Sequence, residues 1–594
     1  MRIADAIVTA LRELDTRYVF GVSGANIEHI HDSIERLGNG RLTSVLAKRE
    51  DGAAFMADAR ARVHRTLGVC CSTSGGGMMN LVAGLAESHA ESVPVLALVG
   101  QPPAALDGRG SFQDSSGIGR TVDGLSMLAS VTKKTVRITD PRVFWAQLRD
   151  AIETALSGRM GPVALLIPRD SYELEVGPFP ADWPSDISAF IQPQPVDDGE
   201  VRELFGRLRE ATAPVLVLGH GVRRSCDPDA VRLFAQRARI PVLTTMGARG
   251  EFPNDDPLYL GVVGGGGHPS AASYVEKSDL VVLVGTGLAM MTRGALSGVD
   301  PRKFAAVNID PGELLRSAVT DTVVRGDASQ VFHRLGRLLD TEPFTAPSCE
   351  GYELTRFVPR PATPVPGRET PAESDALLQS EAVGIIEEYL PRDGHLLYDA
   401  GNCAVASMHY ASVPPGSSST IALGMGGMGY SIPGAVGAQL GSPEGTRSVV
   451  FCGDGAFLMS GLEVHTAVEL GLPVLFVVFN NGMHGMCATR QQTFFDSRIT
   501  TVQYTPVDVQ SVARGLGTPD QLWVGSAGTR SELVALLSDH RRRSHPTGVL
   551  ELRLEVEEVP PFAAFLPPDE PTVAVPRPWQ DLASYHDAET MATA

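Results

Sequence analysis

Cysteine is scarce in this sequence, and its spacing argues against both a disulfide framework and a structural zinc site. The chain has seven cysteines among 594 residues, and no two of them form a Cys-x-x-Cys pair. Scattered single cysteines favour reduced thiols over a disulfide framework or a structural zinc site. We therefore expect a cytoplasmic protein.

Basic residues and long apolar runs are also in short supply. Lys and Arg number 50 against 69 Asp and Glu, which gives a formal net charge of −19. This charge disfavours nonspecific binding to nucleic acid or to an acidic membrane. No apolar run approaches the length that spans a bilayer, and Met1-Arg-Ile-Ala-Asp-Ala-Ile begins an amphipathic helix pattern rather than a signal peptide. We expect neither nucleic acid nor a membrane as a partner.

What the sequence does contain is a repeated alternation of short apolar strands and amphipathic helices. This alternation is typical of parallel sheets covered by helices on both faces, and the length exceeds what one hydrophobic core usually serves. We predict an α/β chain with three doubly wound parallel-sheet domains, of which the first and third look like two copies of one architecture. The predicted boundaries are 1–185, 195–340 and 376–560 for the domains, 341–375 for a linker, and 561–594 for a C-terminal tail.

Two predicted strands of the third segment end on small oxygen-bearing residues. One apolar run leads into Gly453-Asp454-Gly455, and the next leads into Asn480-Asn481. The 27 residues from Asp454 to Asn481 suffice for a helix and a return strand, so both side chains can reach one point beyond neighbouring strand ends. A carboxylate, an amide oxygen and a backbone carbonyl suit Mg²⁺, and the start of the following helix suits phosphate. The alternative is that both motifs are turns that merely end strands.

This pair of motifs resembles the thiamin diphosphate motif, Gly-Asp-Gly followed by Asn-Asn. The neighbouring residues are similar to the acetolactate synthase and pyruvate oxidase branch of the thiamin diphosphate-dependent enzymes, over nearly the whole chain, in the order pyrimidine, central and diphosphate domain. The resemblance implies that Asp454, Asn481 and the carbonyl of Met483 bind Mg²⁺, which bridges the cofactor's diphosphate. The cofactor contacts that it implies in the third domain are Gly401, Asn402, Cys403, Gly426, Met428, Gly453, Asp454, Gly455, Ala456, Asn481, Met483, His484, Gly485 and Met486.

The stretch Gly424-Met-Gly-Gly-Met-Gly-Tyr-Ser-Ile-Pro433 carries part of this resemblance. In the family a Met of this stretch supports the bent cofactor from below, which gives that role to Met428. The carbonyl of Gly426 would accept a hydrogen bond from the cofactor's 4′-amino group. Outside the motif, Met428 would be interpreted as a gap-filling core residue.

The first segment carries a candidate for the acid of the reaction. Glu50 begins a predicted helix, where an acidic residue is favoured by the helix dipole alone. The stretch Ala47-Lys-Arg-Glu-Asp-Gly-Ala-Ala-Phe-Met-Ala-Asp58 resembles the family's Arg-His-Glu-x-x-Ala-Ala-x-Met-Ala-Asp. In that family the Glu donates a hydrogen bond to N1′ of the aminopyrimidine. The resemblance therefore makes Glu50 a catalytic acid/base group that acts through the cofactor.

Other first-segment motifs imply contacts with the cofactor ring and the substrate. Thr73-Ser-Gly-Gly-Gly-Met-Met-Asn80 resembles the loop along the pyrimidine, which implies Thr73, Gly77 and Asn80 as cofactor contacts, with Gly76 where the family has Pro. Phe112-Gln113-Asp114 resembles Phe-Gln-Glu. That motif implies a catalytic position for Gln113 near the attacked carbonyl and a substrate position for Phe112. The alternative for Gln113 is a solvated loop amide.

Two further residues are substrate candidates. Asn26 belongs to the loop Gly21-Val-Ser-Gly-Ala-Asn26, which resembles Gly-x-Pro-Gly. Arg490 stands where acetolactate synthases carry an acceptor-sensing Trp, and we expect it to pair with a carboxylate or phosphate on the acceptor. The alternative for Arg490 is a surface side chain on a loop.

The resemblance implies decarboxylation of a 2-oxo acid such as pyruvate, followed by transfer to a second carbonyl acceptor. A simple 2-oxo acid decarboxylase and a flavin-dependent oxidase are the alternatives. FAD is not implied, because Gly287-Leu-Ala-Met-Met-Thr-Arg-Gly294 departs from the family's Arg-Phe-Asp-Asp-Arg. The resemblance also implies a homodimer or homotetramer, in which Glu50 of one subunit serves the cofactor held by Asp454 and Asn481 of another.

Overall fold

The chain is described here from a computed structural model. The structure describes residues 1–192, 194–296, 298–310, 312, 320, 322–347, 352–360, 376–543, 547–555, 557–566 and 570–575. Parts of the predicted linker (348–351 and 361–375) and of the predicted tail (567–569 and 576–594) lie outside the described residues.

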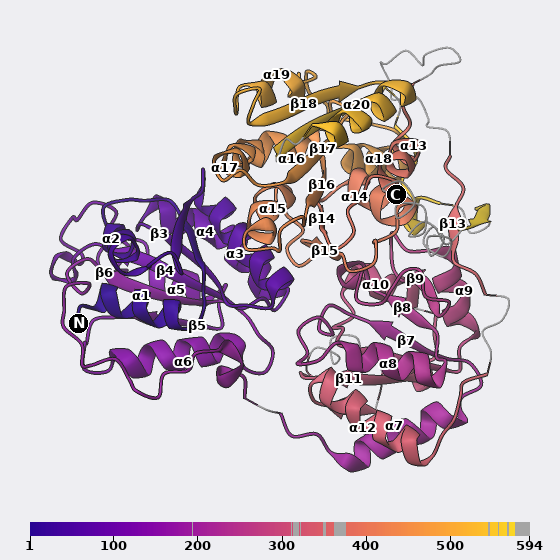
Figure 1. The fold of residues 1–594 in the computed structure, drawn as a ribbon, viewed down its shortest axis with the longest axis horizontal. Helices are drawn as coiled ribbons and strands as arrows, with labels where there is room; N and C mark the ends of the chain where they lie inside the picture. The colour runs from indigo at the N-terminus through magenta and orange to yellow at the C-terminus, as the bar shows by residue number, and fades with distance from the viewer. Residues whose placement is uncertain are drawn as a thin grey trace, which may run out of the picture.

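Three six-stranded sheets, all parallel, form the body of the protein (Figure 1). The first has the order β2-β1-β3-β4-β6-β5, the second β12-β11-β10-β7-β8-β9, and the third β15-β14-β16-β17-β19-β18. The strands of the first sheet are β1 (Tyr18–Gly21), β2 (Thr43–Leu46), β3 (Gly68–Ser72), β4 (Val95–Gln101), β5 (Lys134–Arg137) and β6 (Val163–Pro168). Those of the second are β7 (Pro214–Leu218), β8 (Val242–Thr244), β9 (Tyr259–Val262), β10 (Leu280–Val284), β11 (Phe304–Asn308) and β12 (Val323–Arg325). Those of the third are β14 (His395–Tyr398), β15 (Ser418–Ile421), β16 (Ser448–Gly453), β17 (Val474–Asn480), β18 (Leu522–Ala527) and β19 (Thr547–Arg553).

The strand orders confirm the predicted fold class. Numbered within each domain, the first and third sheets share the order 2-1-3-4-6-5, so these two domains are copies of one architecture. The central sheet has the order 6-5-4-1-2-3, which is the doubly wound dinucleotide-binding order read from the other edge. Its direction of winding reverses between β7 and β10, and ligands of such sheets bind beyond the strand ends at that point.

Helices cover both faces of the sheets. In the first domain they are α1 (Ile3–Glu13), α2 (Glu28–Leu37), α3 (Glu50–His64), α4 (Gly76–Ala90), α5 (Gly124–Ala129) and α6 (Phe144–Leu156). In the central domain they are α7 (Asp198–Glu210), α8 (Asp229–Ala238), α9 (Pro269–Lys277), α10 (Met290–Arg293) and α12 (Ala328–Thr341). In the third they are α13 (Gln379–Glu387), α14 (Asn402–Tyr410), α15 (Ser431–Gln439), α16 (Asp454–Ser460), α17 (Val464–Glu469), α18 (Gly485–Phe494), α19 (Val509–Arg514) and α20 (Arg530–Arg542).

The first and third domains share one apolar core through α3 and α15. A single buried cluster contains residues of both domains, among them Phe20, Ala53 and Val436. The two helices approach closely because α15 has glycine at the contact: a Cβ on Gly437 would lie 2.0 Å from the backbone oxygen of Met56. The α3–α15 contact therefore fixes how the two domains sit against each other.

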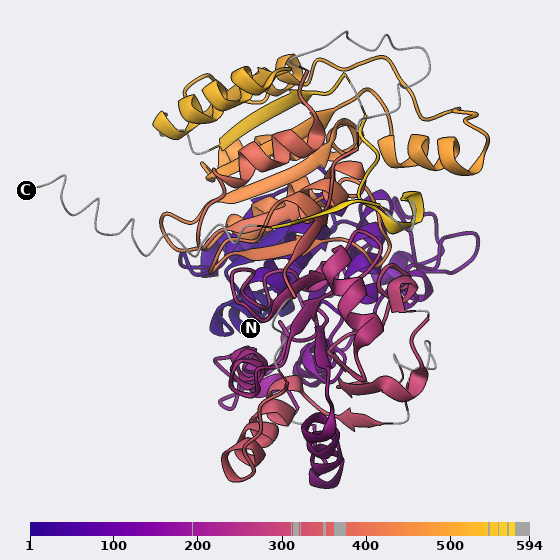
Figure 2. The same cartoon turned by 90° about the vertical axis from the view of Figure 1, so that its right-hand side faces the viewer.

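A short antiparallel pair lies apart from the three large sheets. β13 (Thr355–Phe357) pairs with β20 (Thr572–Ala574), so the predicted linker and tail each contribute a strand. Figure 2 shows the third domain stacked on the central domain, with the first domain behind them in this view. Among the described residues, no helix combines the length and the apolar character that crossing a membrane requires.

Candidate functional site

The two polar strand ends of the third domain meet, as the sequence predicts. β16 and β17 pair in parallel with Gly453 opposite Phe479, so Asp454 and Asn481 follow at the same edge of the sheet. Asp454 is the first residue of α16 and is 1% exposed. Its Oδ2 accepts a hydrogen bond from the Gly482 N–H at 2.8 Å, and its Oδ1 accepts one from the Gly455 N–H at 3.0 Å. Burial raises the pKa of Asp454, a penalty that a bound cation would offset.

Two buried polar atoms beside Asp454 have no hydrogen-bond partner among the described residues. They are Oδ1 of Asn402 and Nδ1 of His484, both predicted as cofactor contacts. A buried polar atom without a partner costs about 1–3 kcal/mol, so the pair indicates a polar ligand. His484 Nδ1 can donate to a phosphate oxygen, and Asn402 Oδ1 can accept from a water of hydrated Mg²⁺. The residues present therefore fit a metal-bound diphosphate.

Glycines allow the walls of this site to lie close together, because they lack a side chain. A Cβ on Gly455 would lie 2.8 Å from His484 Nδ1 and 2.9 Å from Met428 Cε. A Cβ on Gly485 would lie 3.0 Å from Asn481 Nδ2 and 3.2 Å from Asn402 Nδ2. The remaining predicted contacts lie on the same elements. Gly401 precedes α14, Ala456 is buried in α16, and Met486 lies in α18. Cys403 lies 3.9 Å from a Cβ built on Gly453, and Met483 is 3% exposed. The structure thus brings the predicted diphosphate residues to one place.

The loop that carries Met428 is attached to the end of β14 by a buried carboxylate. Asp399 is 1% exposed; its Oδ1 accepts from the Gly429 N–H at 2.8 Å and its Oδ2 from the Ser431 N–H at 2.9 Å. Within the loop, Gly426 has φ = 66°, a left-handed conformation that favours glycine. Asp399 therefore fixes the position from which Met428 faces Gly455.

The predicted ring-side residues lie together in the first domain. Glu50 is the first residue of α3, and its Oε2 accepts a hydrogen bond from Asn80 Nδ2 at 2.8 Å. A Cβ on Gly77 would lie 2.9 Å from Glu50 Oε1, so this glycine permits the carboxyl group to sit against α4. Glu50, Gly77 and Asn80 thus form one cluster, with the carboxyl oriented by the Asn80 amide.

Gln113 lies against the loop that contains Thr73. Its Oε1 accepts hydrogen bonds at 3.4 Å from both Thr73 Oγ1 and Ser74 Oγ, and Asn26 Nδ2 donates to Ser74 Oγ at 2.7 Å. Gln113 has φ = 61°, and non-glycine residues held in this region often belong to functional sites. Its neighbour Phe112 is 80% exposed. The structure therefore brings Gln113, Asn26 and Thr73 together and leaves Phe112 at the surface of the chain.

Arg490 lies on α18 and is exposed, whereas the preceding Thr489 is buried. Thr489 Oγ1 accepts from Asn402 Nδ2 at 3.3 Å. α18 thus turns Thr489 toward the diphosphate residues and Arg490 toward the surface of the chain.

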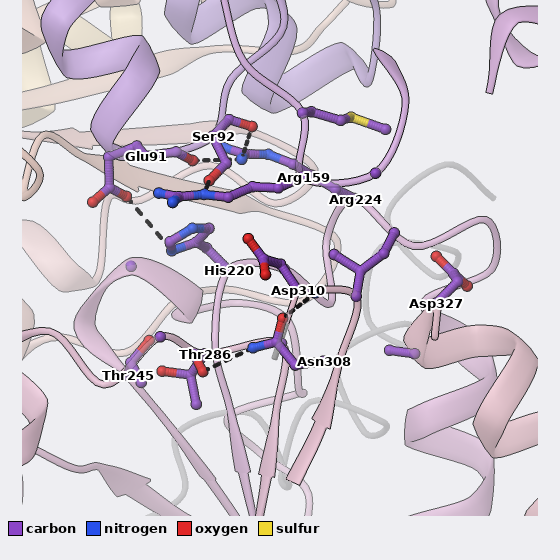
Figure 3. Close-up of a pocket in the computed structure, with 18 of the residues that line it drawn as sticks. Glu91, Ser92, Arg159, His220, Arg224, Thr245, Thr286, Asn308, Asp310 and Asp327 are labelled. Atoms are coloured by element: carbon purple, nitrogen blue, oxygen red, sulfur yellow. Dashed lines mark hydrogen bonds and ion pairs between the residues drawn. The ribbon is translucent and has the colours of Figure 1, made fainter. Parts of the chain in front are cut away.

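A separate cavity of about 830 Å³ lies between the central and first domains (Figure 3). It lies beyond the ends of β7, β10 and β11, at the reversal point of the central sheet. Its size suits a small-molecule or nucleotide ligand. The stretch 287–293, which departs from the family's flavin pattern, forms part of its wall.

Charged side chains of both domains meet in this cavity. Arg159 Nε donates to Ser92 Oγ at 2.7 Å, and Arg224 donates to the backbone oxygens of Glu91 and Ser92. His220 Nδ1 lies 3.5 Å from Glu91 Oε2, and burial together with nearby arginines lowers the pKa of His220 well below its usual value. The wall includes Leu423 and Gly424, so the cavity reaches the loop that carries Met428.

Two carboxylates of the site belong to none of the motifs singled out in the sequence. Glu557 accepts hydrogen bonds from Asn402 and Asn481, and Glu87 of α4 accepts from the N–H groups of Gly424 and Met425 at 3.1 and 2.7 Å. Both are carboxylates that lie far along the chain from the groups that they bind. A buried acidic residue within an apolar helix pattern could have identified Glu87. Glu557 follows β19 among other acidic residues and carries no such signal.

Three family models match the chain. The thiamine pyrophosphate enzyme N-terminal TPP binding domain matches residues 1–118, the central domain matches residues 201–335, and the C-terminal TPP binding domain matches residues 399–549. Glu50 lies in the first match, and Asp454 and Asn481 lie in the third.

Curated relatives match over most of their length. An acetolactate synthase large subunit of Parasynechococcus marenigrum (strain WH8102) is 31% identical over 502 residues, which cover 83% of this chain and 78% of that protein. An acetolactate synthase large subunit of Corynebacterium glutamicum is 30% identical over 86% of this chain and 81% of that protein. A probable acetolactate synthase large subunit of Methanocaldococcus jannaschii is 29% identical over 84% of each chain.

Proposed function

Because this chain belongs to the thiamine pyrophosphate enzyme family, we propose that it is a carboligase that uses thiamin diphosphate and Mg²⁺. It removes CO₂ from a 2-oxo acid, with pyruvate as the expected donor, and joins the remaining fragment to a second carbonyl compound. The observation that carries this proposal is the meeting of Asp454 and Asn481 beside the unpartnered atoms of Asn402 and His484. The names of the relatives favour joining over simple decarboxylation.

The third domain holds the charged end of the cofactor. Asp454, the amide oxygen of Asn481 and the carbonyl of Met483 bind Mg²⁺, a set of hard oxygen ligands that suits this ion. Asn402 and His484 contact the diphosphate or the waters of the metal. Bound thiamin diphosphate supplies the carbon nucleophile and the electron sink that decarboxylation needs.

The first domain controls a proton at the ring of the cofactor. The Glu50 carboxyl would hold this proton, and the Asn80 amide orients the carboxyl through its 2.8 Å hydrogen bond. Gln113 and Asn26 lie on the same side, where their amides can contact the oxygens of a 2-oxo acid. Arg490 recognises the charged group of the acceptor. Positioned acid/base groups of this kind contribute about 10²- to 10⁴-fold to a rate.

The complete site requires a second copy of the chain. Exposed apolar side chains surround both half-sites, and contiguous exposed apolar surface favours protein contact. Beside the Glu50 half they are Met79, Phe112 and Ile118; beside the Asp454 half they are Met425, Leu458, Met459 and Leu462. The second copy would cover these side chains and place Glu50 of one subunit opposite the metal ligands of the other.

A product analysis tests the proposed reaction. The protein is incubated with thiamin diphosphate, Mg²⁺ and labelled pyruvate, together with a panel of aldehydes and 2-oxo acids, and the products are measured by mass spectrometry. We expect CO₂ release and a labelled product whose mass is the sum of the donor fragment and one acceptor. Aldehyde as the only product would identify a decarboxylase. An oxidised acyl product with a flavin spectrum would identify an oxidase. No turnover of any 2-oxo acid would refute the proposal.

A further inference from the structure

Glu557, a carboxylate that belongs to none of the sequence motifs, lies on the side of the predicted diphosphate site where the metal ligands lie. Glu557 follows β19, and its Oε2 accepts a hydrogen bond from Asn481 Nδ2 at 2.7 Å. Its Oε1 accepts one from Asn402 Nδ2 at 2.6 Å. One carboxyl group thus binds the amide of a predicted metal ligand and the amide of a predicted cofactor contact.

The chain around Glu557 is held at both sides. The Leu554 N–H donates to the backbone oxygen of Asn480 at 2.9 Å, so this segment continues beside the end of β17. Glu558 accepts from the N–H and Oγ of Ser380 at 2.6 and 2.7 Å. Glu557 lies between these two attachments, which limit where its carboxyl group can lie.

The glycine at position 485 makes room for this carboxylate. A Cβ there would lie 2.7 Å from Glu557 Oε1 and 3.0 Å from Asn481 Nδ2. Such distances are too short for carbon beside oxygen or nitrogen, so any other residue would displace the Glu557 carboxyl. Gly485 and Glu557 therefore belong to one arrangement.

The hydrogen bonds of Glu557 decide which end of each amide faces the ligand. An asparagine amide has an oxygen that accepts and a nitrogen that donates, and the two ends have nearly the same size. An ionised carboxylate can only accept, so it binds the nitrogen end. With its nitrogen held by Glu557, Asn481 turns its oxygen away from Glu557. That oxygen accepts one hydrogen bond, from the Met483 N–H at 3.1 Å, which leaves its second lone pair for a cation. The reversed amide would present N–H groups to Mg²⁺ and repel it.

We propose that Glu557 is a positioning residue that orients Asn481 and Asn402 for Mg²⁺ and the diphosphate. This inference rests on the proposed function, because it concerns the same metal site. Groups that hold a metal ligand in orientation typically contribute about 10- to 100-fold to metal affinity. The structure assigns Glu557 this indirect role because each of its oxygens binds the amide nitrogen of a predicted ligand or cofactor contact.

The test measures Mg²⁺ affinity directly. Wild-type protein and the Glu557→Gln variant are titrated with Mg²⁺ at a fixed concentration of thiamin diphosphate, and binding is followed by calorimetry. A Gln at 557 can accept from only one amide and places its own N–H groups against the other. We expect the apparent Kd for Mg²⁺ to rise about 10- to 100-fold. Glu387→Gln is the matched control, because it alters a carboxylate that accepts from the Ser412 N–H at 2.7 Å rather than from either amide, and its Kd should equal that of the wild type.

Two further variants separate orientation from charge and from direct ligation. Glu557→Asp keeps the charge but is too short to reach both amides, so we expect it to lose affinity as well; full affinity would show that charge alone matters. Asn481→Ala is combined with Glu557→Gln in a double-mutant cycle. If Glu557 acts through Asn481, the double variant loses less affinity than the product of the two single losses, and any remaining loss beyond Asn481→Ala acts through Asn402. Losses that multiply would overturn the positioning role.

The failures of the two proposals are distinguishable. If the wild-type protein binds no Mg²⁺ together with thiamin diphosphate, the proposed function fails. If the wild type binds both and Glu557→Gln binds Mg²⁺ equally well, the positioning role fails and the proposed function stands. Circular dichroism and thermal unfolding of each variant exclude loss of fold as the cause of a weaker affinity.

Discussion

Under the proposed function, Glu50 and Asp454 mark two half-sites that can be inactivated one at a time. Glu50→Gln keeps an oxygen that can accept from Asn80 Nδ2 at 2.8 Å, so it removes the acid proton and preserves the local fold. Asp454→Asn keeps one oxygen for the Gly482 N–H at 2.8 Å but removes the charge that we propose binds Mg²⁺. We expect Glu50→Gln to lower turnover by about 10²- to 10⁴-fold, and the Asp454→Asn protein to be inactive at ordinary Mg²⁺ concentrations.

The two variants together report where the complete site lies. In a dimer whose sites combine Glu50 of one subunit with Asp454 of the other, a heterodimer of the two variants has one site with both defects and one site with none. Symmetry then predicts about half of the wild-type activity per dimer, although each parent is nearly inactive. If Glu50 instead served the Asp454 of its own chain, both sites of the heterodimer would carry one defect.

The assay uses co-expressed subunits with two different affinity tags. Heterodimers are isolated by successive purification on both tags, and CO₂ release from pyruvate is measured with saturating thiamin diphosphate and Mg²⁺. Wild-type subunits carrying the same two tags provide the reference. Activity of the heterodimer at the level of its parents would refute the shared site.

Three other predictions concern packing, substrate choice and the central cavity. Gly437→Ala should lower the free energy of unfolding by about 1–3 kcal/mol, as is typical of overpacking, because its Cβ would meet the Met56 oxygen at 2.0 Å; thermal unfolding measures this loss. Gly384→Ala is the control and should not lower the midpoint, since Gly384 lies on the exposed side of α13 with no atom within 4 Å of its Cβ. Arg490→Ala should raise KM for acceptors with a carboxylate or phosphate more than for neutral aldehydes, and an equal rise for both would contradict its role. Purified protein should show no flavin absorbance, and carboligation should proceed without added flavin; a stoichiometric flavin spectrum would contradict this expectation.

The sequence predicts best where function depends on residues close together in the chain. Asp454 and Asn481 each follow an apolar strand, and the rule that parallel strands end at one edge was enough to place them together. Glu50 at the start of α3 is likewise a local feature. These predictions needed only the periodicity of the strands, the spacing between motifs and a family resemblance.

The sequence does not show contacts between distant segments. Glu557 lies 76 residues after Asn481, and Glu87 lies 337 residues before Gly424. Neither spacing leaves a pattern in the sequence, because such contacts depend on how whole domains pack. The β13–β20 pair was missed for the same reason, as its strands come from segments that lack hydrophobic periodicity.

The shared strand order of the first and third sheets affects which substitutions this protein can tolerate. Two copies of one architecture in a single chain can each lose a chemical group that the other retains, and under the proposed function one copy keeps the acid and the other keeps the metal ligands. Neither copy would be competent alone. Substitutions at the surface between them should therefore be constrained as tightly as substitutions at the groups that handle the substrate.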